Sequence, residues 1–338
     1  MKSPITGKEM SIEVRNTEIK FRKETFSVDY PSFYCDDSKE FFTTTEFDTI
    51  KMKQVYNQYR DMYNLPFPEE IKEIRSKYGL SATKMSELLG FGINSYRNYE
   101  NGEVPSQSNA NLIQLASDPK KFKTLVEIST LVEDDSKDKI ELLKRIDRLI
   151  EERNKKFHHI RLEDLNLYLV DETLPNNFSG FLKPSIEKLT EMVVFFASTM
   201  QPYVTKLNKL LFYSDFLNYK YDAISISGTR YRAIDKGPVP NNYDRIFDYM
   251  KAKGAIDIVE KEYDWGYSKQ FVSNRKFKSE LFKDFEIEIL NEVLKTFKDK
   301  NTSEIVELSH KEDAWKENFH NGKSLIDYKY AFNLKNIS

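Results

Sequence analysis

Cysteine is almost absent from this sequence, which holds a single thiol, Cys35, in 338 residues. One cysteine excludes an intramolecular disulfide and is typical of a protein kept in a reducing cytoplasm. Long apolar runs are lacking as well, and no stretch of the sequence has the length needed to span a bilayer. We therefore expect a cytoplasmic protein that has no membrane partner.

Net charge is nearly absent too, because 52 Lys and Arg residues are balanced by 54 Asp and Glu residues. The molecule as a whole would not attract a polyanion, so any binding of nucleic acid must depend on a local patch. Hydrophobic residues make up 39% of the chain, which is enough for packed cores. A chain of this length is expected to form two or three domains.

The hydrophobic pattern changes along the chain. Residues 1–50 alternate apolar and polar positions, which is typical of strands, whereas helical spacing dominates afterwards. The pattern predicts a mainly α, multidomain fold with a small N-terminal β-rich unit. The expected parts are a β unit with a connecting helix (1–68), a group of short helices (69–124), a helical linker (125–180) and a C-terminal helical domain (181–338).

The group of short helices has the spacing of a helix-turn-helix. One buried face is predicted for the first helix, at positions i, i+3 and i+7, by Ile71, Ile74 and Tyr78. Gly79 suits a left-handed C-terminal cap, Ser81 is a good N-cap for the second helix, and Gly90 closes that helix. A short turn through Gly92 then lets the next helix cross the preceding one and enter a major groove of DNA.

Residues 81–102 resemble the lambda-repressor-like class, and specifically antitoxins of the MqsA type, in which the Leu-Gly turn and the aromatic-Glu-x-Gly ending recur together. The resemblance implies that the start of the third helix reads DNA bases, and the residues that lie there are Asn94, Ser95, Tyr96, Arg97 and Asn98. Asn can bond adenine and Arg can bond guanine. Many related proteins carry Arg where this chain has Asn98, so the docking mode carries over and the base preference does not.

Two observations keep a structural interpretation of this segment open. Asn94 can serve merely as an N-cap, and residues 69–105 hold five basic against six acidic side chains. Phosphate contacts supply most of the affinity for DNA, so a neutral domain must take charge from Lys120, Lys121 and Lys123 or bind as a dimer. We therefore expect a homodimer on double-stranded operator DNA.

The MqsA-type antitoxins also carry a zinc ribbon with two Cys-x-x-Cys knuckles ahead of the helix-turn-helix. The corresponding positions of this chain are Ser3, Thr6, Cys35 and Ser38. Hydroxyls are poor zinc ligands and one thiolate does not hold a structural zinc ion. Apolar positions such as Ile12, Val14 and Phe26 are expected to maintain the fold instead. We expect no metal and no cofactor; an unrelated β unit is the alternative.

Three motifs of the C-terminal part occur in a recognisable order, at residues 205–216, 228–240 and 308–315. Together they resemble the Panacea domain, also called the SocA-like domain, over roughly residues 181–330. The resemblance implies a module that neutralises a toxin encoded beside it. Catalytic chemistry is not known for this fold, so the protein is not expected to be an enzyme.

Candidate toxin-binding residues follow from the composition of the last two motifs. Arginine and aromatic residues dominate protein interfaces, and a Gly-Pro-containing loop is rigid. The expected toxin-binding residues are Arg230, Tyr231, Arg232, Gly237, Pro238, Val239 and Trp315. An alternative is acid–base catalysis by Asp215, His310 and Asp313, but a lone His beside Trp315 is more often a packing residue, and no nucleophile accompanies it.

The sequence thus predicts a type II antitoxin that neutralises a cognate protein toxin through its C-terminal domain and represses its own operon through the helix-turn-helix. A phage or prophage transcriptional regulator without a toxin partner is the alternative. A third class, a nuclease or another toxin in its own right, lacks the residues for that chemistry.

Overall fold

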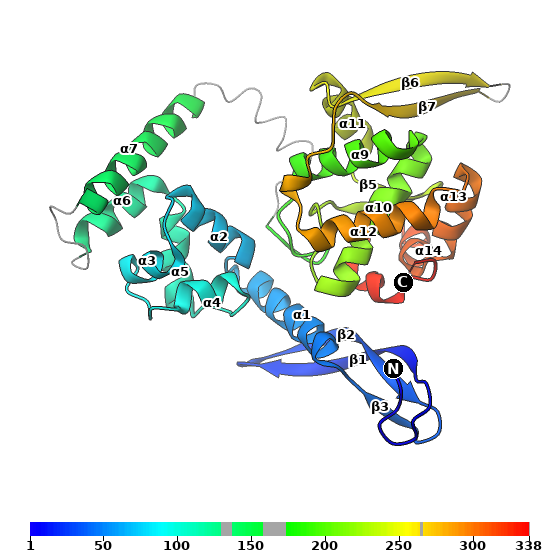
Figure 1. Ribbon diagram of the computed structural model, residues 1–338, viewed down its shortest axis with the longest axis horizontal. Helices are drawn as coiled ribbons and strands as arrows, with labels where there is room; N and C mark the ends of the chain where they lie inside the picture. The colour runs from blue at the N-terminus through cyan, green and yellow to red at the C-terminus, as the bar shows by residue number, and fades with distance from the viewer. Residues whose placement is uncertain (130–136, 158–173, 264–265, 338) are drawn as a thin grey trace. The chain divides into compact units, whose positions relative to one another are not determined.

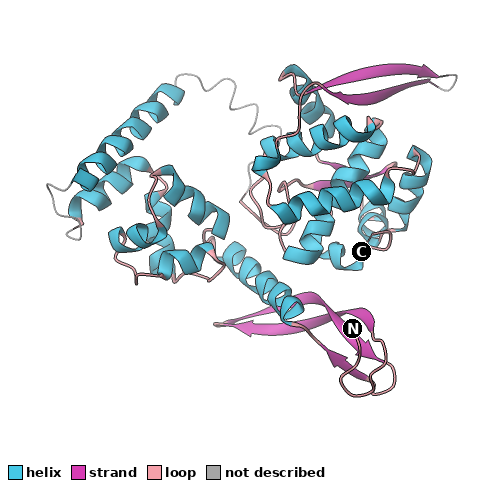
Figure 2. Cartoon of the chain, viewed as in Figure 1, coloured by secondary structure: helices cyan, strands magenta, loops and turns pink. Residues whose placement is uncertain are grey.

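The chain folds into a mainly helical structure with a small N-terminal sheet, as the sequence predicts (Figures 1 and 2). The computed structural model describes residues 1–129, 137–157, 174–263 and 266–337. The chain divides into two compact units, one made of residues 1–55 with 166–338 and the other of residues 56–165.

An antiparallel three-stranded sheet with the order β1-β2-β3 forms the N-terminal part. Its strands are β1 (Ser11–Phe21), β2 (Glu24–Cys35) and β3 (Glu40–Phe42). Alternate side chains of β2 are buried, including Phe26 and Val28, which confirms the two-residue period. On β1, however, Ile12 is 60% exposed and Val14 is also exposed. The expectation that both help to hold this unit together is therefore wrong, because β1 is an edge strand with its side chains mostly in solvent.

Helix α1 (Thr45–Tyr63) follows the sheet and continues into the second unit. In this second unit Arg60 is buried, and its guanidinium donates to the carbonyls of Gly102 at 2.6 Å and Glu103 at 3.3 Å. These carbonyls lie just after a short helix, so the buried cation fixes the loop that leaves it.

Six helices make up the rest of the second unit in its described parts. They are α2 (Pro68–Lys77), α3 (Ala82–Leu88), α4 (Ser95–Glu100), α5 (Gln107–Ala116), α6 (Pro119–Ile128) and α7 (Lys137–Phe157). The predicted helix ends are confirmed. The Ser81 hydroxyl accepts from the backbone N–H of Lys84 at 3.1 Å, and Gly79 and Gly90 have left-handed φ values of 67° and 71°.

One apolar core joins these helices, and α7 contributes to it. Leu142 and Ile146 of α7 are buried together with Phe122 and Val126 of α6 and the apolar face of α2. The end of α6 from residue 125 and helix α7, both expected to belong to a helical linker, therefore contribute to the core of the second unit. The apolar stripe of α7 covers the short helices, which are too small to bury a core by themselves. Residues 158–173 of the expected linker lie outside the described residues.

The C-terminal part is a helical assembly with two small hairpins. Its elements are α9 (Ile186–Met200), α10 (Val204–Asp222), β4 (Tyr231–Ile234), β5 (Gly237–Pro240), α11 (Tyr243–Ala252), β6 (Ile256–Tyr263), β7 (Gly266–Ser273), η1 (Ser279–Leu281), α12 (Asp284–Phe297), α13 (Thr302–Lys311), α14 (Asp313–His320) and η2 (Tyr328–Asn333). Strands β4 and β5 pair antiparallel, as do β6 and β7.

Helix α10 lies at the centre of this part, in contact with α9, α12, α13, β5 and η2. All of its residues from Lys206 to Tyr219 are buried, including Lys209 and Asp215. A helix that is buried all round belongs to the interior of a domain. Among the described helices, none combines the length and the apolar character required to cross a membrane.

We expect Leu211→Ala to lower the free energy of unfolding by about 2–5 kcal/mol, because Leu211 has no exposed surface and its removal leaves a cavity. Urea unfolding followed by tryptophan fluorescence measures this, since both tryptophans, Trp265 and Trp315, belong to the C-terminal part. Leu174→Ala is the matched control: the same change at a side chain that is 63% exposed should cost less than about 0.5 kcal/mol. Equal effects of the two substitutions would contradict the central position of α10.

Candidate interaction surfaces

An ion pair fixes α4 against α2 in the second unit. The Arg75 guanidinium donates through Nε and Nη2 to the two carboxylate oxygens of Glu100, at 2.6 and 3.1 Å, and through Nη1 to the carbonyl of Leu80 at 2.7 Å. The carboxylate of Glu100 raises the pKa of Arg75, which keeps the guanidinium charged. Because a bidentate pair restrains direction as well as distance, it sets the orientation of α4.

Tyr96 is a core residue, and its predicted place among the DNA-contacting residues is wrong. Its side chain is 0% exposed, and its hydroxyl donates to the carbonyl of Ile71 at 2.8 Å. Its backbone N–H donates to Ser86 Oγ at 3.0 Å. Tyrosine fits this position because its ring fills the core while its hydroxyl finds a polar partner. Tyr96 therefore positions α4 and cannot reach a ligand.

The remaining predicted residues lie on the outer side of α4. Asn94, Arg97 and Asn98 are exposed, and Ser95 is half-buried. Asn94 occupies the N-cap position, but its side chain makes no capping hydrogen bond. The interpretation of Asn94 merely as a cap therefore loses its physical basis. Sequence reasoning missed Ile93, which is 63% exposed beside these residues. Its position directly before the N-cap, where it belongs to no apolar face of a helix, could have indicated this exposure.

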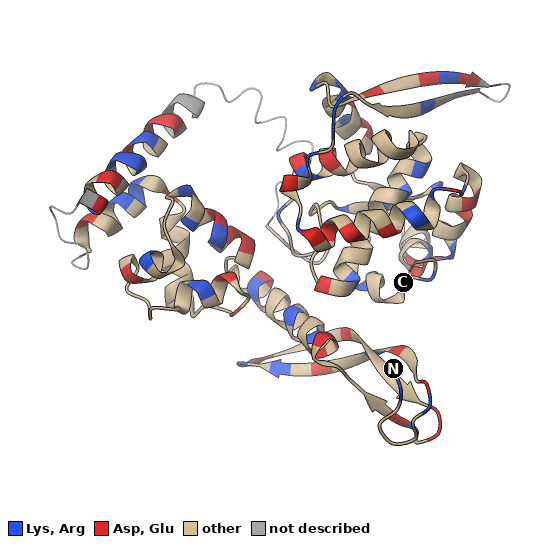
Figure 3. Cartoon of the chain, in the orientation of Figure 1, with Lys and Arg blue, Asp and Glu red and all other residues tan. Residues whose placement is uncertain are grey.

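Basic side chains from α6 were expected to add charge to this surface. Lys120 and Lys121 are exposed at the start of α6, where Asp118 caps the helix through their backbone N–H groups. The ammonium of Lys123, however, donates to Asp147 of α7 at 2.7 Å. Lys123 is thus largely neutralised, and Lys120 and Lys121 are the α6 lysines whose charge can reach a polyanion. Charges of both signs are mixed over α2 and α7 (Figure 3).

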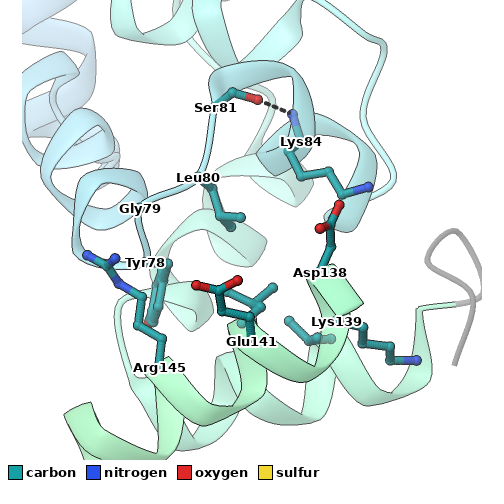
Figure 4. A pocket seen from close by; sticks show the side chains of 11 residues that line it. Tyr78, Gly79, Leu80, Ser81, Lys84, Asp138, Lys139, Glu141 and Arg145 are labelled. Carbon is teal, nitrogen blue, oxygen red and sulfur yellow. Dashed lines mark hydrogen bonds between the residues drawn. The ribbon is translucent and has the colours of Figure 1, made fainter. Parts of the chain in front are cut away.

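A pocket of about 470 Å³ lies between α7 and the turn that joins α2 to α3 (Figure 4). Arg145 of α7 lines it and donates through Nε to the carbonyl of Lys77 at 3.2 Å, near the end of α2. A Cβ at Gly79 would meet the movable end of the Arg145 side chain at 2.6 Å, so it is the positive φ of 67° that favours glycine there. Arg145 thereby fixes α7 onto the turn.

The four positions that correspond to zinc ligands are brought together in the N-terminal unit. Hydrogen bonds from Ser3, and then from Ser38 and Thr6, lower the pKa of the buried Cys35 thiol to about 6. Thr6 Oγ1 lies 3.6 Å from Cys35 Sγ. One thiol among three hydroxyls is a poor donor set for zinc. Within the described parts of the chain, no group of three or more His, Cys, Asp or Glu side chains is placed to hold a metal ion.

In the C-terminal part, Asp215 is the centre of a buried hydrogen-bond network. Its carboxylate accepts from the backbone N–H groups of Ile226 and Ser227, both at 2.8 Å, from Ser227 Oγ at 2.6 Å and from the Tyr231 hydroxyl at 2.7 Å. Burial raises the pKa of Asp215, while these hydrogen bonds act in the opposite direction. Tyr231, predicted to contact a toxin, has no exposed surface. That prediction is wrong because the Tyr231 ring packs on Phe212 and Phe216 of α10.

The segment Gly237–Pro240 is a buried strand, β5, and not the exposed rigid loop that its composition suggests. Lys209 of α10 has no exposed surface and donates from Nζ to the carbonyl of Pro238 at 3.0 Å. A Cβ at Gly237 would lie 2.5 Å from Lys209 Cε and 2.4 Å from Ser309 Oγ, so glycine permits this close packing. The predicted toxin-binding residues Gly237, Pro238 and Val239 therefore attach β5 to the core.

Trp315 is half-buried and has a structural partner on either side. Its indole Nε1 donates to the carbonyl of Ile234 at 2.8 Å, and its ring stacks on His310 at 3.8 Å. Burial, and then the charge of Lys209, lower the pKa of His310. Asp313 pairs with Lys335 at 2.5 Å. The structure thus places Trp315 in the packing between α13, α14 and β4, with part of its surface exposed.

Arg232 and residues of α11 line a second pocket, of about 330 Å³, on the outside of the β4–β5 hairpin. Arg232 Nε donates to Asn241 Oδ1 at 3.2 Å and Nη1 donates to the carbonyl of Lys323 at 3.0 Å, so its guanidinium is held in place. Tyr243 and the exposed Arg245 line the same pocket. Of the predicted toxin-binding residues, Arg230, Arg232 and Trp315 keep part of their surface in solvent. Arg245 was missed, although it lies just beyond the Gly-Pro motif.

A comparison with protein families identifies this part of the chain. Residues 207–316 match the family model described as antitoxin SocA-like, Panacea domain. No curated protein matches the chain. The matched residues, here called the Panacea segment, include α10 from its fourth residue, the β4–β5 hairpin, the Arg232 pocket and α13. The resemblance inferred from the three C-terminal motifs is thereby confirmed, whereas the resemblance of the N-terminal part to MqsA-type antitoxins stays a prediction.

Lys209 should make the stability of the Panacea segment depend on pH. Burial lowers its folded-state pKa from 10.5 to about 7, so between these values the unfolded chain binds more protons than the folded one. The free energy of unfolding should therefore rise with pH, by up to about 1.4 kcal/mol per pH unit from this group. Lys209→Met should reduce the slope between pH 7.5 and 9.5 by that amount in urea unfolding. Lys251→Met, an exposed control on α11, should keep the wild-type slope.

Proposed function

We propose that this protein is an antitoxin whose Panacea segment binds and neutralises a protein toxin encoded beside it. The match of residues 207–316 to the SocA-like antitoxin domain carries this proposal. A non-catalytic role agrees with the chemistry of the acid–base candidates. Asp215 is fully buried and engaged by four donors, and His310 is stacked on Trp315.

The Arg232 pocket is the surface that we assign to the toxin. Interfaces are anchored by arginine and aromatic side chains at pockets, and a side chain already held in its bound position loses little entropy on binding. Arg232 is held by Asn241 and Lys323, while Tyr243 and Arg245 border the same hollow. By contrast, Tyr231 and β5 are buried. Their role in binding is to hold the strand that carries Arg232 in place.

We further propose that residues 69–124 bind double-stranded operator DNA and repress the operon of the antitoxin. Support comes from the exposed Asn94, Arg97 and Asn98 on α4 and from the ion pair that orients this helix. The small excess of basic charge available from Lys120 and Lys121 favours a homodimer, because two copies double the phosphate contacts. The toxin partner distinguishes this function from that of a phage or prophage regulator.

Arg245→Ala should weaken binding of the toxin about tenfold or more, because it removes an exposed cation from the pocket without touching the core. The test measures binding of the purified full chain to the product of the adjacent reading frame by calorimetry, together with rescue of growth in cells that express that product. Lys251→Ala, on the same helix but outside the pocket, should leave both unchanged. If neither the wild type nor the variants bind any neighbouring gene product, the regulator without a toxin is the better function.

Replacing Arg97 and Asn98 together by Ala should reduce discrimination between the DNA upstream of the reading frame and an unrelated duplex, because each lost base contact is worth about 1–3 kcal/mol. Fluorescence anisotropy at fixed salt measures both affinities. Lys72→Ala, an exposed change on α2, serves as the control and should preserve the ratio. Unchanged discrimination in the double variant would remove α4 from the proposed DNA interface.

A further inference from the structure

Ile93 exposes a large apolar side chain at the point where the chain enters α4. It is 63% exposed, although the nearby Leu88, Leu89 and Tyr96 are all buried in the core of the second unit. A single exposed isoleucine is ordinary on a protein surface. What distinguishes Ile93 is its position directly before Asn94, on the turn between α3 and α4.

The side chains around Ile93 form a small surface of defined chemistry. Asn94, Arg97 and Asn98 are exposed, and among the described residues none forms a hydrogen bond with their side chains. The carboxylate of α4, Glu100, is turned to Arg75. The outer side of α4, together with Ile93 and Asn94 directly before it, therefore offers two amides, one cation and one branched apolar group, while the one acidic side chain of α4 is paired with Arg75.

We propose that Ile93 contacts the 5-methyl group of a thymine, an inference that rests on the proposed binding of operator DNA by α4. The major groove presents donors and acceptors on every base pair, but a single apolar group, the thymine methyl. An isoleucine cannot bond a donor or an acceptor, and it would leave them unsatisfied at any other base edge. Ile93 and Asn94 lie directly before α4, and the exposed Arg97 and Asn98 lie within its first four residues, so the apolar contact falls close to the bases that these polar side chains would read.

The contact makes binding depend on one methyl group. Burying a methyl group against Ile93 should strengthen binding about fourfold per half-site, by the usual worth of one buried carbon. Deoxyuridine pairs like thymidine and lacks this methyl group. Replacing one contacted thymine by deoxyuridine should therefore weaken binding of the wild type about fourfold, and Ile93→Ala, which changes both protomers of the proposed homodimer, should weaken binding to the thymine duplex about sixteenfold.

The experiment is a cycle of two proteins and two duplexes. The full-length wild type and Ile93→Ala are titrated with the DNA upstream of the reading frame and with versions in which each footprinted thymine is replaced in turn by deoxyuridine. At one position per half-site, the wild type should distinguish the two duplexes and Ile93→Ala should not. Ile93→Val, which keeps a branched apolar group, should restore the difference. Thermal melts should agree for all three proteins because the side chain is exposed.

Each other outcome overturns the inference in a distinguishable way. If the wild type binds its upstream DNA but no deoxyuridine changes the affinity, Ile93 does not read a methyl group and the proposed operator binding stands. The same conclusion follows if Ile93→Ala keeps the deoxyuridine penalty. If Ile93→Ala dissociates a dimer in sedimentation, the side chain belongs to a contact between copies. If the wild type binds no DNA specifically, the operator function and the methyl contact fail together.

Discussion

The buried carboxylate of Asp215 is the constraint on which the architecture of the Panacea segment depends. A carboxylate without exposure has lost its hydration and destabilises the fold unless other donors replace water. The donors here come from Ile226, Ser227 and Tyr231, which lie 11, 12 and 16 residues further along the chain. They reach Asp215 only if the chain turns back along α10 after its last turn. Satisfying one side chain thus fixes both the loop and the start of β4.

The side chains of strand β4 point alternately into the core and towards solvent. The inward side chains stabilise the fold, and the outward ones are accessible to a partner. Tyr231 and Ala233 are buried, while Arg232 and Ile234 keep part of their surface exposed. Lys209 holds the partner strand β5 through the carbonyl of Pro238. A buried lysine with one such partner is costly when charged, which is the physical reason why its pKa falls to about 7. The hairpin within the Panacea segment is therefore mostly interior, and its exposed surface consists of the residues between and beyond its buried positions.

Local sequence signals predicted the helices of the second unit well. They predicted poorly which tyrosine side chains are exposed, in this unit and in the C-terminal part. Ser81, Gly79 and Gly90 act within a few residues of the chain, so capping and turn rules place them correctly. Tyr96 was expected at a surface because the lambda-repressor-like resemblance places it in the DNA-reading segment, and Tyr231 because aromatic residues are common in interfaces. Their hydroxyl partners, the carbonyl of Ile71 and the carboxylate of Asp215, lie far along the chain or on another element. Sequence patterns carry no information about such partners, nor about the core that α7 completes.

The two candidate surfaces share one arrangement: a buried tyrosine is adjacent in the sequence to arginine residues that are at least partly exposed. Tyr96 precedes Arg97, and Tyr231 lies between Arg230 and Arg232. In each case the hydroxyl is held in the interior at 2.7–2.8 Å, which fixes the backbone from which the arginine projects. A guanidinium that starts from a fixed backbone loses less conformational freedom on binding than one on a mobile loop. In the proposed binding of toxin and DNA, the buried tyrosines would therefore act without touching a partner, by limiting the positions from which the exposed arginines reach it.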